Sequence, residues 1–194
     1  MYVLLCLIIL LFYVIPVYRR PRILKGLLSN EECEYIKDKS RDKLSSSTVG
    51  NERIVDENTR ISETAWLELE DPKILKIAER CLKYTDRPIV NCEKLQVVRY
   101  KDNGFYKLHS DILPKVNNKR LHTFILALND NYDGGETDFP NINMKYKLKK
   151  GDCLMFDNLD NYNLNTSQSL HSGCPVKGEK WIANLWVRIY PYEN

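Results

Sequence analysis

The sequence predicts a single α+β domain in which N-terminal helices back a jelly-roll core of short β-strands. Two helix-start signals stand in the first half of the chain. After residue 93, short apolar or alternating runs are separated by glycine-containing turns, which is typical of a β-sandwich or jelly roll. A length of 194 residues, 43% of them hydrophobic, suits one domain with a sizeable core. We expect three parts: a hydrophobic segment at 1–20, a helical and loop support region at 21–92 and the core at 93–190.

The chain begins with an apolar run from Tyr2 to Val17, which ends before Arg19 and Arg20. The run is slightly shorter than the roughly 20 residues that span a bilayer, but local thinning and snorkelling absorb such a mismatch. No charged region precedes it and no small-residue cleavage site follows it, so a retained membrane anchor is favoured over a cleaved signal. The arginines favour a cytoplasmic domain, whereas secretory substrates would require the opposite side. The side of the membrane therefore stays open.

Two helices are predicted in the support region. Ser29 and Glu32 have the spacing of a capping box, which predicts a helix running to about Leu44. Asp71 and Pro72 begin a second helix, whose apolar residues share one face: Ile74, Ile77, Ala78, Cys81 and Leu82. The polar segment 45–64 between them predicts a mobile loop or weak hairpin that could cover a site.

The core is predicted from runs with strand character. Four such runs are the segments 95–100, 121–128, 153–156 and 181–190. The turns between strands combine glycine with Asp, Asn or Lys, as at 102–104, 133–135, 150–152 and 177–178. No internal repeat is visible.

Charge and cysteine content exclude some function classes. The net charge of +3 is spread along the chain without a basic arm, so we expect no nucleic-acid partner. The 6 cysteines form no CxxC pair, which argues against a zinc ribbon or a thioredoxin motif. One or two disulfides remain open at this point.

A candidate metal site is formed by His109, Asp111 and His171. In an extended strand the side chains at i and i+2 point to one face, so His109 and Asp111 could converge on one ion. His171 would supply a third ligand. Two histidines and one carboxylate form the facial triad of non-haem Fe(II) oxygenases, which leaves positions open for a chelating co-substrate and oxygen. His122 lies outside this pattern, and we expect it to be a packed or surface residue.

Lys180 is a candidate anion-binding residue at the start of the last strong strand. A cation in this place could hold the far carboxylate of a diacid whose other end chelates the metal. Trp181 and Trp186 have opposite parity along the same strand, so we expect one in the core and the other facing the cavity.

The order of motifs extends this interpretation over almost the whole chain after residue 20. The segments are Pro21-Arg22-Ile23, Leu28 to Cys33, Arg60-Ile61-Ser62, Leu95 to Tyr100, Gly104 to Asp111, Asp133 to Pro140, Lys150-Gly151-Asp152, Leu170 to Val176 and Gly178 to Trp181. Together they resemble the prolyl 4-hydroxylase branch of the Fe(II)- and 2-oxoglutarate-dependent dioxygenases. The resemblance implies a double-stranded β-helix, which is the jelly roll of this family.

The resemblance also implies residue roles. His109, Asp111 and His171 would be the catalytic iron ligands, and Lys180 would bind the C5 carboxylate of 2-oxoglutarate. Tyr100 and Thr123 match positions that help to seat this co-substrate. Trp186 lies where the family has a second aromatic residue near the site, and Arg120 stands at the start of the same strand as Thr123. From His171 to Lys180 the sequence has one residue fewer than the family usually has, although Gly-Glu-Lys-Trp stays intact.

The activity implied by the resemblance is hydroxylation of a peptidyl proline at C4 by O2. 2-Oxoglutarate would be decarboxylated to succinate and CO2, and L-ascorbate would rescue oxidised iron. We also expect attachment to an endomembrane through the N-terminal segment. Two alternatives stay open: the same chemistry on lysine or another side chain, and an inactive membrane-tethered interaction module.

Overall fold

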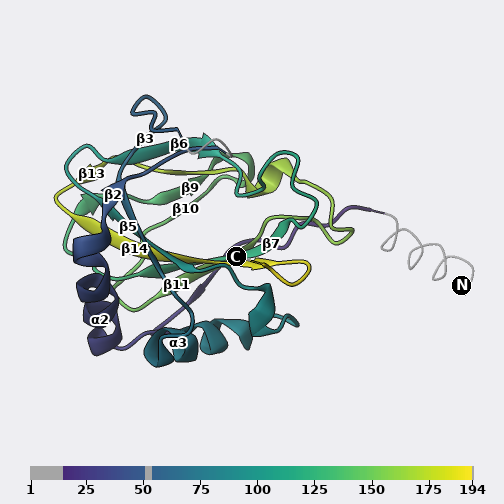
Figure 1. The fold of residues 1–194 in the computed structure, drawn as a ribbon. Helices are drawn as coiled ribbons and strands as arrows, with labels where there is room; N and C mark the ends of the chain where they lie inside the picture. Colours follow the sequence, from purple (N-terminus) through teal and green to yellow (C-terminus); the bar gives the residue numbers. More distant parts are fainter. Residues whose placement is uncertain (1–14, 51–53, 194) are drawn as a thin grey trace, which may run out of the picture.

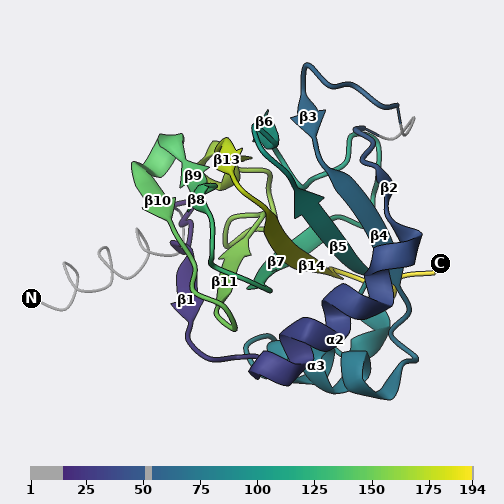
Figure 2. The ribbon, with the colours of Figure 1, turned by 90° about the vertical axis from the view of Figure 1, so that its left-hand side faces the viewer.

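The structure is a computed structural model that describes residues 15–50 and 54–193. Two β-sheets lie face to face, and two helices cover the outer face of the larger sheet (Figures 1 and 2). The predicted anchor at residues 1–20 falls largely on residues 1–14, which lie outside the described part of the chain. Within the described residues, no helix has the length and apolar character needed to cross a bilayer.

The larger sheet has seven strands in the order β1-β11-β7-β14-β5-β4-β2, and its neighbours pair antiparallel. In that order the strands are Arg22–Leu24, Cys153–Asp157, Arg120–Ala127, Lys180–Arg188, Leu95–Tyr100, Glu63–Leu67 and Ser45–Ser46. The four strands predicted from apolar runs are its central members, each within two residues of its predicted ends. They were predictable because both of their faces are buried, so nearly every residue in them is apolar or packed.

The smaller sheet has five strands in the order β10-β9-β12-β6-β3, and β13 and β8 form a separate pair. These strands are Met144–Tyr146, Thr137–Phe139, His171–Gly173, Phe105–His109 and Arg60–Ile61, followed by Val176–Lys177 and Asp133–Gly134. Most are two or three residues long and partly exposed, so they carry little hydrophobic periodicity. For this reason these strands were not predicted as separate elements.

Both predicted helices form. Helix α2 (Asn30–Ser40) begins after Ser29, whose hydroxyl accepts from the Glu32 N–H while the Glu32 carboxylate accepts from the Ser29 N–H. It ends four residues before the predicted limit at Leu44, because a 3-10 turn follows at Arg41–Lys43. Helix α3 (Pro72–Leu82) is capped by Asp71. Further 3-10 turns are Ile89–Asn91, Pro140–Ile142 and Ser167–Ser169.

The alternation of strand side chains divides the apolar residues into two cores. Along β7, Phe124 and Leu126 point to the helices, whereas Ile125 and Ala127 point into the space between the sheets. Trp181 packs in the helix-side core, and the inter-sheet core is completed by residues such as Phe139 of the smaller sheet. The larger sheet therefore serves as the central layer, with one face for stability and one face for the site.

The described residues of the segment 45–64 agree with the weak hairpin that was predicted as the alternative to a mobile loop. The segment contains β2, β3 and an antiparallel bridge between Val49 and Ile54, and the Ser47 and Thr64 hydroxyls lie 2.6 Å apart. The described cysteines, Cys33, Cys81, Cys92, Cys153 and Cys174, are free thiols, so the possible disulfides do not form among them.

Candidate metal and co-substrate site

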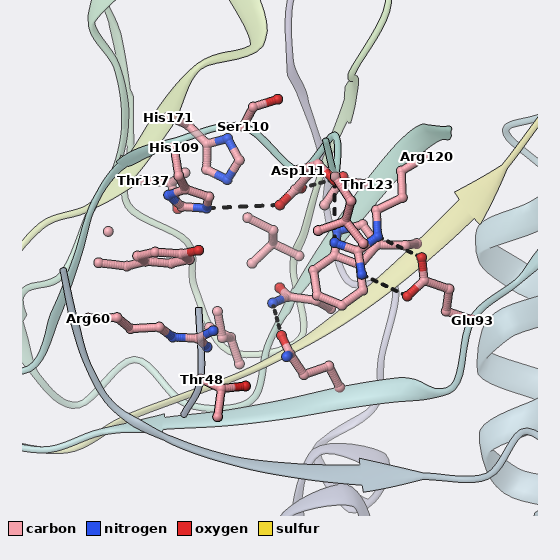
Figure 3. Close-up of a pocket in the computed structure, with 18 of the residues that line it drawn as sticks. Thr48, Arg60, Glu93, His109, Ser110, Asp111, Arg120, Thr123, Thr137 and His171 are labelled. Carbon is pink, nitrogen blue, oxygen red and sulfur yellow. Dashed lines mark hydrogen bonds and ion pairs between the residues drawn. The ribbon is translucent and has the colours of Figure 1, made fainter. Parts of the chain in front are cut away.

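A cavity of about 650 Å³ opens between the two sheets (Figure 3). Its walls come from β5, β7 and β14 of the larger sheet and from β6, β9 and β12 of the smaller one. All the site residues predicted from the sequence, His109, Asp111, His171, Lys180, Tyr100 and Thr123, line this one cavity. Trp186, which the resemblance places near the site, lines the cavity as well, and so does Arg120.

Three potential metal ligands converge in the cavity. One ligand atom each of His109, Asp111 and His171 lies within 4.8 Å of the others. His109 ends β6 and is paired directly across the sheet with His171, which begins β12. Asp111 lies in a bend beyond the end of β6, and its Oδ1 is 3.9 Å from His109 Nε2. The predicted convergence is therefore present, although a bend rather than a continuous strand places Asp111.

Hydrogen bonds fix which nitrogen of each histidine faces the centre. His109 Nδ1 lies 2.7 Å from the Lys107 carbonyl oxygen, and His171 Nδ1 lies 3.0 Å from the Ser169 carbonyl oxygen. A carbonyl oxygen only accepts hydrogen bonds, so each Nδ1 carries the proton. Each Nε2 then offers its lone pair to an ion, and such a carbonyl partner is the usual means of fixing a metal-binding imidazole.

Burial and neighbouring groups set the charges of the ligands. Burial and the nearby His171 lower the pKa of His109 to about 3, so its imidazole is neutral at physiological pH. Burial acts to raise the pKa of Asp111, but His171, His109 and Arg120 outweigh it and lower this pKa to about 2. The cluster thus combines imidazole nitrogens with an ionised carboxylate, which is a donor set that suits Fe(II).

Lys180 is a buried cation whose charge is not balanced by a carboxylate. Its side chain is 5% exposed, and Nζ donates to the Gly135 carbonyl oxygen at 2.7 Å. Among the described residues, no Asp or Glu forms an ion pair with it. Burial, assisted by the nearby Lys147 ammonium, lowers the pKa of Lys180 to about 8. A buried ammonium of this kind favours an anionic ligand in the cavity.

The one-residue-short interval before Lys180 does not displace it from the cavity. Gly178 adopts φ +97° in the turn that leads into β14, and Lys180 then pairs with Tyr100 across the sheet. Tyr100 is buried, and the Lys180 ammonium lies 5.4 Å from the centre of its ring. Lys180 and Tyr100 therefore lie beside each other at the same end of the cavity.

Thr123 differs from its predicted role beside the co-substrate, and Thr137 is an additional residue of the cavity wall. The Thr123 hydroxyl donates to Asp111 Oδ2 at 2.7 Å, so it is committed to a ligand of the metal cluster (Figure 3). Thr137, on β9, also lines the cavity and was not selected from the sequence. Its motif, Asp133 to Pro140, was recognised, but a three-residue strand gives no periodicity from which to infer which side chains face inward.

A buried ionic cluster forms another wall of the cavity. Arg120 donates two hydrogen bonds to the Glu93 carboxylate, at 2.6 and 2.7 Å, and Arg188 forms an ion pair with the same carboxylate at 2.8 Å. The Arg120 guanidinium lies 3.5 Å from the centre of the Trp186 ring and also donates to the Asp111 carbonyl oxygen at 3.4 Å. Sequence reasoning missed Glu93 and Arg188, because lone charged residues carry no signal of a buried partner distant in the chain.

Two remaining predictions are confirmed by contacts. Trp181 packs in the helix-side core while Trp186 faces the cavity, as their opposite parity requires. His122 is packed on the other side of β7, where its Nδ1 lies 2.7 Å from Asp157 Oδ1. Arg60 is an addition: it is 6% exposed, lines the cavity and lies over the Tyr106 ring at 4.7 Å.

Comparison with known proteins first defines the class. Residues 95–188 match the family model described as the 2OG-Fe(II) oxygenase superfamily. The matched segment begins with β5, ends with β14 and contains the three ligands and Lys180. The fold and the site thus define the chain as an Fe(II)- and 2-oxoglutarate-dependent oxygenase.

Individual relatives define the branch. A protein of Acanthamoeba polyphaga mimivirus, provisionally named as a prolyl 4-hydroxylase, is 37% identical over an alignment of 183 residues that covers 88% of this chain and 75% of that protein. Prolyl 4-hydroxylase 1 of Arabidopsis thaliana is 34% identical over 87% of this chain and 69% of its own length. The crystal structure of the viral collagen prolyl hydroxylase of Paramecium bursaria Chlorella virus-1, in complex with 2-oxoglutarate, superposes with a TM-score of 0.73 at 28% identity. That match covers 89% of this chain and 97% of the viral chain. The chain belongs to the prolyl 4-hydroxylase family of 2OG-Fe(II) oxygenases.

The ionic cluster around Glu93 predicts a large stability effect. The substitution Glu93→Gln should lower the free energy of unfolding by about 3 kcal/mol, because it leaves two buried guanidiniums without a carboxylate. Urea unfolding measures this change. The matched control is Glu68→Gln, which removes an exposed ion pair with Lys94 and should cost less than about 1 kcal/mol. Equal losses in the two variants would show that Glu93 is not a buried counterion.

Proposed function

We propose that the protein hydroxylates C4 of a peptidyl proline. The reaction consumes O2 and 2-oxoglutarate and yields 4-hydroxyproline, succinate and CO2. The observation that carries this proposal is the presence, in one cavity, of the His–Asp–His cluster and a buried lysine that has no carboxylate partner in the described part of the chain. Family membership supports it, since the named relatives are prolyl 4-hydroxylases.

The residues of the site would divide the work as follows. His109, Asp111 and His171 would hold Fe(II), which supplies oxygen activation when it is bound. Lys180 would bind the C5 carboxylate of 2-oxoglutarate through its ammonium, while the Tyr100 and Thr137 side chains lie on the wall around it. The inter-sheet core that encloses the site would keep water away from the reacting atoms.

The aromatic lining of the cavity suits a proline-containing peptide. Trp66 and Trp186 line it with ring centres 6.1 Å apart, and Tyr192 lines the same cavity. Aromatic-lined grooves are a common way to recognise extended proline-rich segments. Thr48 and Gly50 of the segment 45–64 also line the cavity, which supports a role for this segment in covering a bound peptide.

The charge of the cavity wall favours proline over the alternative substrate, lysine. Three guanidiniums line the cavity, those of Arg60, Arg120 and Arg188, whereas its only two carboxylates are Glu93 and Asp111 among the described residues. Glu93 is already shared by two arginines, and Asp111 belongs to the metal cluster. The ammonium of a substrate lysine would therefore lie beside a positively charged wall and would find no free carboxylate as its counterion.

The central experiment is a turnover assay on the full chain in detergent. With Fe(II), ¹⁸O2 and 2-oxoglutarate labelled at C1, we expect release of labelled CO2 and one ¹⁸O atom in the proline of a Pro-rich peptide. His109→Ala should reduce both by at least about 100-fold, since even partners of metal ligands contribute 10- to 100-fold. His122→Asn is the matched control and should stay active, because His122 lies outside the cavity. Oxygen in a Lys-rich peptide instead would support the alternative substrate, and no turnover by folded, iron-loaded protein would overturn the enzyme proposal.

Ascorbate enters the proposal as an auxiliary reductant. It would return oxidised iron to Fe(II) after turnovers that decarboxylate 2-oxoglutarate without hydroxylating a peptide. The same assay tests it: omission of ascorbate should shorten the period of linear CO2 release, most strongly when no peptide is present. An unchanged time course would remove ascorbate from the proposal.

The lowered pKa of Lys180 predicts the pH dependence of co-substrate binding. Only the ammonium attracts a carboxylate, so the affinity for 2-oxoglutarate should fall as the pH rises above about 8. Calorimetric titration of the Co(II)-loaded protein measures this affinity without turnover. Lys180→Arg keeps its charge throughout this range, so its binding should be nearly independent of pH. A parallel decline in both proteins would assign the effect to another group.

The same residue makes the ligand-free protein more stable in mild alkali. The pKa of Lys180 is about 8 in the native state and has the ordinary value of 10.5 when unfolded. Between these values the unfolded state binds more protons, so this residue contributes stability that increases with pH. Below pH 8 the buried Lys180 ammonium is fully charged, and its destabilising contribution is fully present. The loss of stability therefore comes from keeping a charged anion-binding group in the cavity.

We also propose that the protein is attached to an endomembrane by its N-terminal segment. The apolar sequence from Tyr2 to Val17 supports this. The residues at the end of this run contact the domain. The Val17 N–H donates to the Asn161 side chain, the Val17 carbonyl oxygen accepts from the Asn161 N–H, and Arg19 forms an ion pair with Asp157 at 2.7 Å. An anchored chain would therefore keep its catalytic domain close to the bilayer.

Vesicle flotation of the full chain tests the attachment. The protein should float with phosphatidylcholine vesicles in high salt, because the contact is apolar. The double substitution Ile8→Lys and Leu11→Lys should release it, since each charge at the centre of a span costs about 3 kcal/mol. A chain that stays at the bottom of the gradient before substitution would overturn the proposal.

A further inference from the structure

The hydrogen bonds behind the metal cluster meet at Asn158. This residue lies in a bend directly after β11 and is 0% exposed. Its Nδ2 donates to Thr123 Oγ1 at 2.8 Å, and Thr123 Oγ1 donates to Asp111 Oδ2 at 2.7 Å. The Asn158 side chain is thus connected to one predicted iron ligand through a single hydroxyl.

The direction of this relay follows from proton counting. An ionised carboxylate only accepts, so the Thr123 hydroxyl must use its single proton for Asp111. Thr123 Oγ1 can then only accept from Asn158, which requires the amide NH2 group at that position. A reversed amide would place two acceptors around one proton. The chemistry of Asp111 therefore determines how the Asn158 amide is turned.

A second branch leaves from the backbone of the same residue. The Ser169 hydroxyl lies 3.1 Å from the Asn158 carbonyl oxygen and 3.0 Å from the Thr166 carbonyl oxygen, so its single proton is shared between them. The Ser169 carbonyl oxygen in turn lies 3.0 Å from His171 Nδ1, the contact that turns His171 Nε2 toward the cluster. Asn158 is itself held to β7, because its N–H donates to the Leu121 carbonyl oxygen at 2.9 Å. One buried residue thus connects to two of the three ligands.

Neither of these two ligands lies inside a regular ladder, although His171 is paired with His109 across β12 and β6. Asp111 lies in a bend, and the register of β12 shifts between His171 and Gly173. His109, by contrast, ends β6 and is oriented by the Lys107 carbonyl oxygen of its own strand. Where the backbone is irregular, the orientation of a ligand depends on its hydrogen-bond partners.

We propose that Asn158 is a positioning residue for the metal site: its amide orients Asp111 through Thr123, and its carbonyl supports His171 through Ser169. The inference rests on the proposed iron ligation and assigns Thr123 to ligand orientation in place of co-substrate binding. Its main consequence is that the amide and the Thr123 hydroxyl act in series, so that removing both has the same effect as removing one.

Metal affinity measured without turnover tests this series. In calorimetric titrations with Co(II), Asn158→Leu and Thr123→Val should each weaken binding about 10-fold, as expected for partners behind a metal ligand. The double variant should also be weakened about 10-fold, not about 100-fold, because both changes break the same relay. Ser169→Ala acts on the other branch, so its effect should multiply with that of Asn158→Leu. The visible spectrum of bound Co(II) should change in each variant as the ligand geometry relaxes.

The matched control is Asn91→Leu, which removes another buried amide, one that donates to the Arg188 and Ile189 carbonyl oxygens. It should lower the melting temperature but leave Co(II) affinity unchanged. If Asn158→Leu does not fold, Asn158→Ser is smaller, cannot reach Thr123, and should show the same loss of affinity.

The possible outcomes distinguish a failure of the Asn158 positioning role from a failure of the proposed iron ligation. Wild-type protein that fails to bind Co(II) would overturn both. Wild-type binding with unchanged affinity and spectrum in folded Asn158 variants would overturn the positioning role alone. Independent, multiplying losses for Asn158→Leu and Thr123→Val would also overturn it, since they would show that the two residues do not act in series.

Discussion

Antiparallel pairing of β6 with β12 sets His171 opposite His109, and the metal site depends on this cross-strand pair. The two strands are short, and neither is stabilised by a long ladder of its own. Their positions are fixed by packing on the larger sheet, where residues of both sheets form the inter-sheet core. The sandwich therefore does for the site what neither strand could do alone: it holds two imidazoles from distant segments within reach of one ion.

The charged groups that would bind ligands in the cavity lower the stability of the ligand-free protein. Lys180 is buried and has no carboxylate partner among the described residues, and the ligand atoms of His109, Asp111 and His171 lie within 4.8 Å of one another. These groups are favourable only when a metal and an anion complete them. Glu93 is shared by Arg120 and Arg188, and Arg60 forms no ion pair with a carboxylate among the described residues, so the cavity wall keeps a net positive charge.

The strands that are buried on both faces were the ones predicted correctly from the sequence. The central strands β5, β7, β11 and β14 were predicted from apolar runs, and both helices from their caps, because these signals are local. The short strands of the smaller sheet were not resolved, because their pairing depends on contacts between segments distant in the chain. Within the site, Thr137 and Glu93 were missed for the same reason: neither position has a local pattern that shows which way its side chain points.

The sequence alone determined the types of residue in the site and their order, from His109 and Asp111 through His171 to Lys180. It also determined the strand and helix periodicities that place these residues in a sandwich. The tertiary structure decided which groups contact one another: Thr123 donates to Asp111, Asn158 donates to Thr123, and Lys180 has no carboxylate counterion among the described residues. The physical reason is that hydrogen bonds and ion pairs depend on distances of a few ångströms, and only packing fixes such distances between residues far apart in the chain.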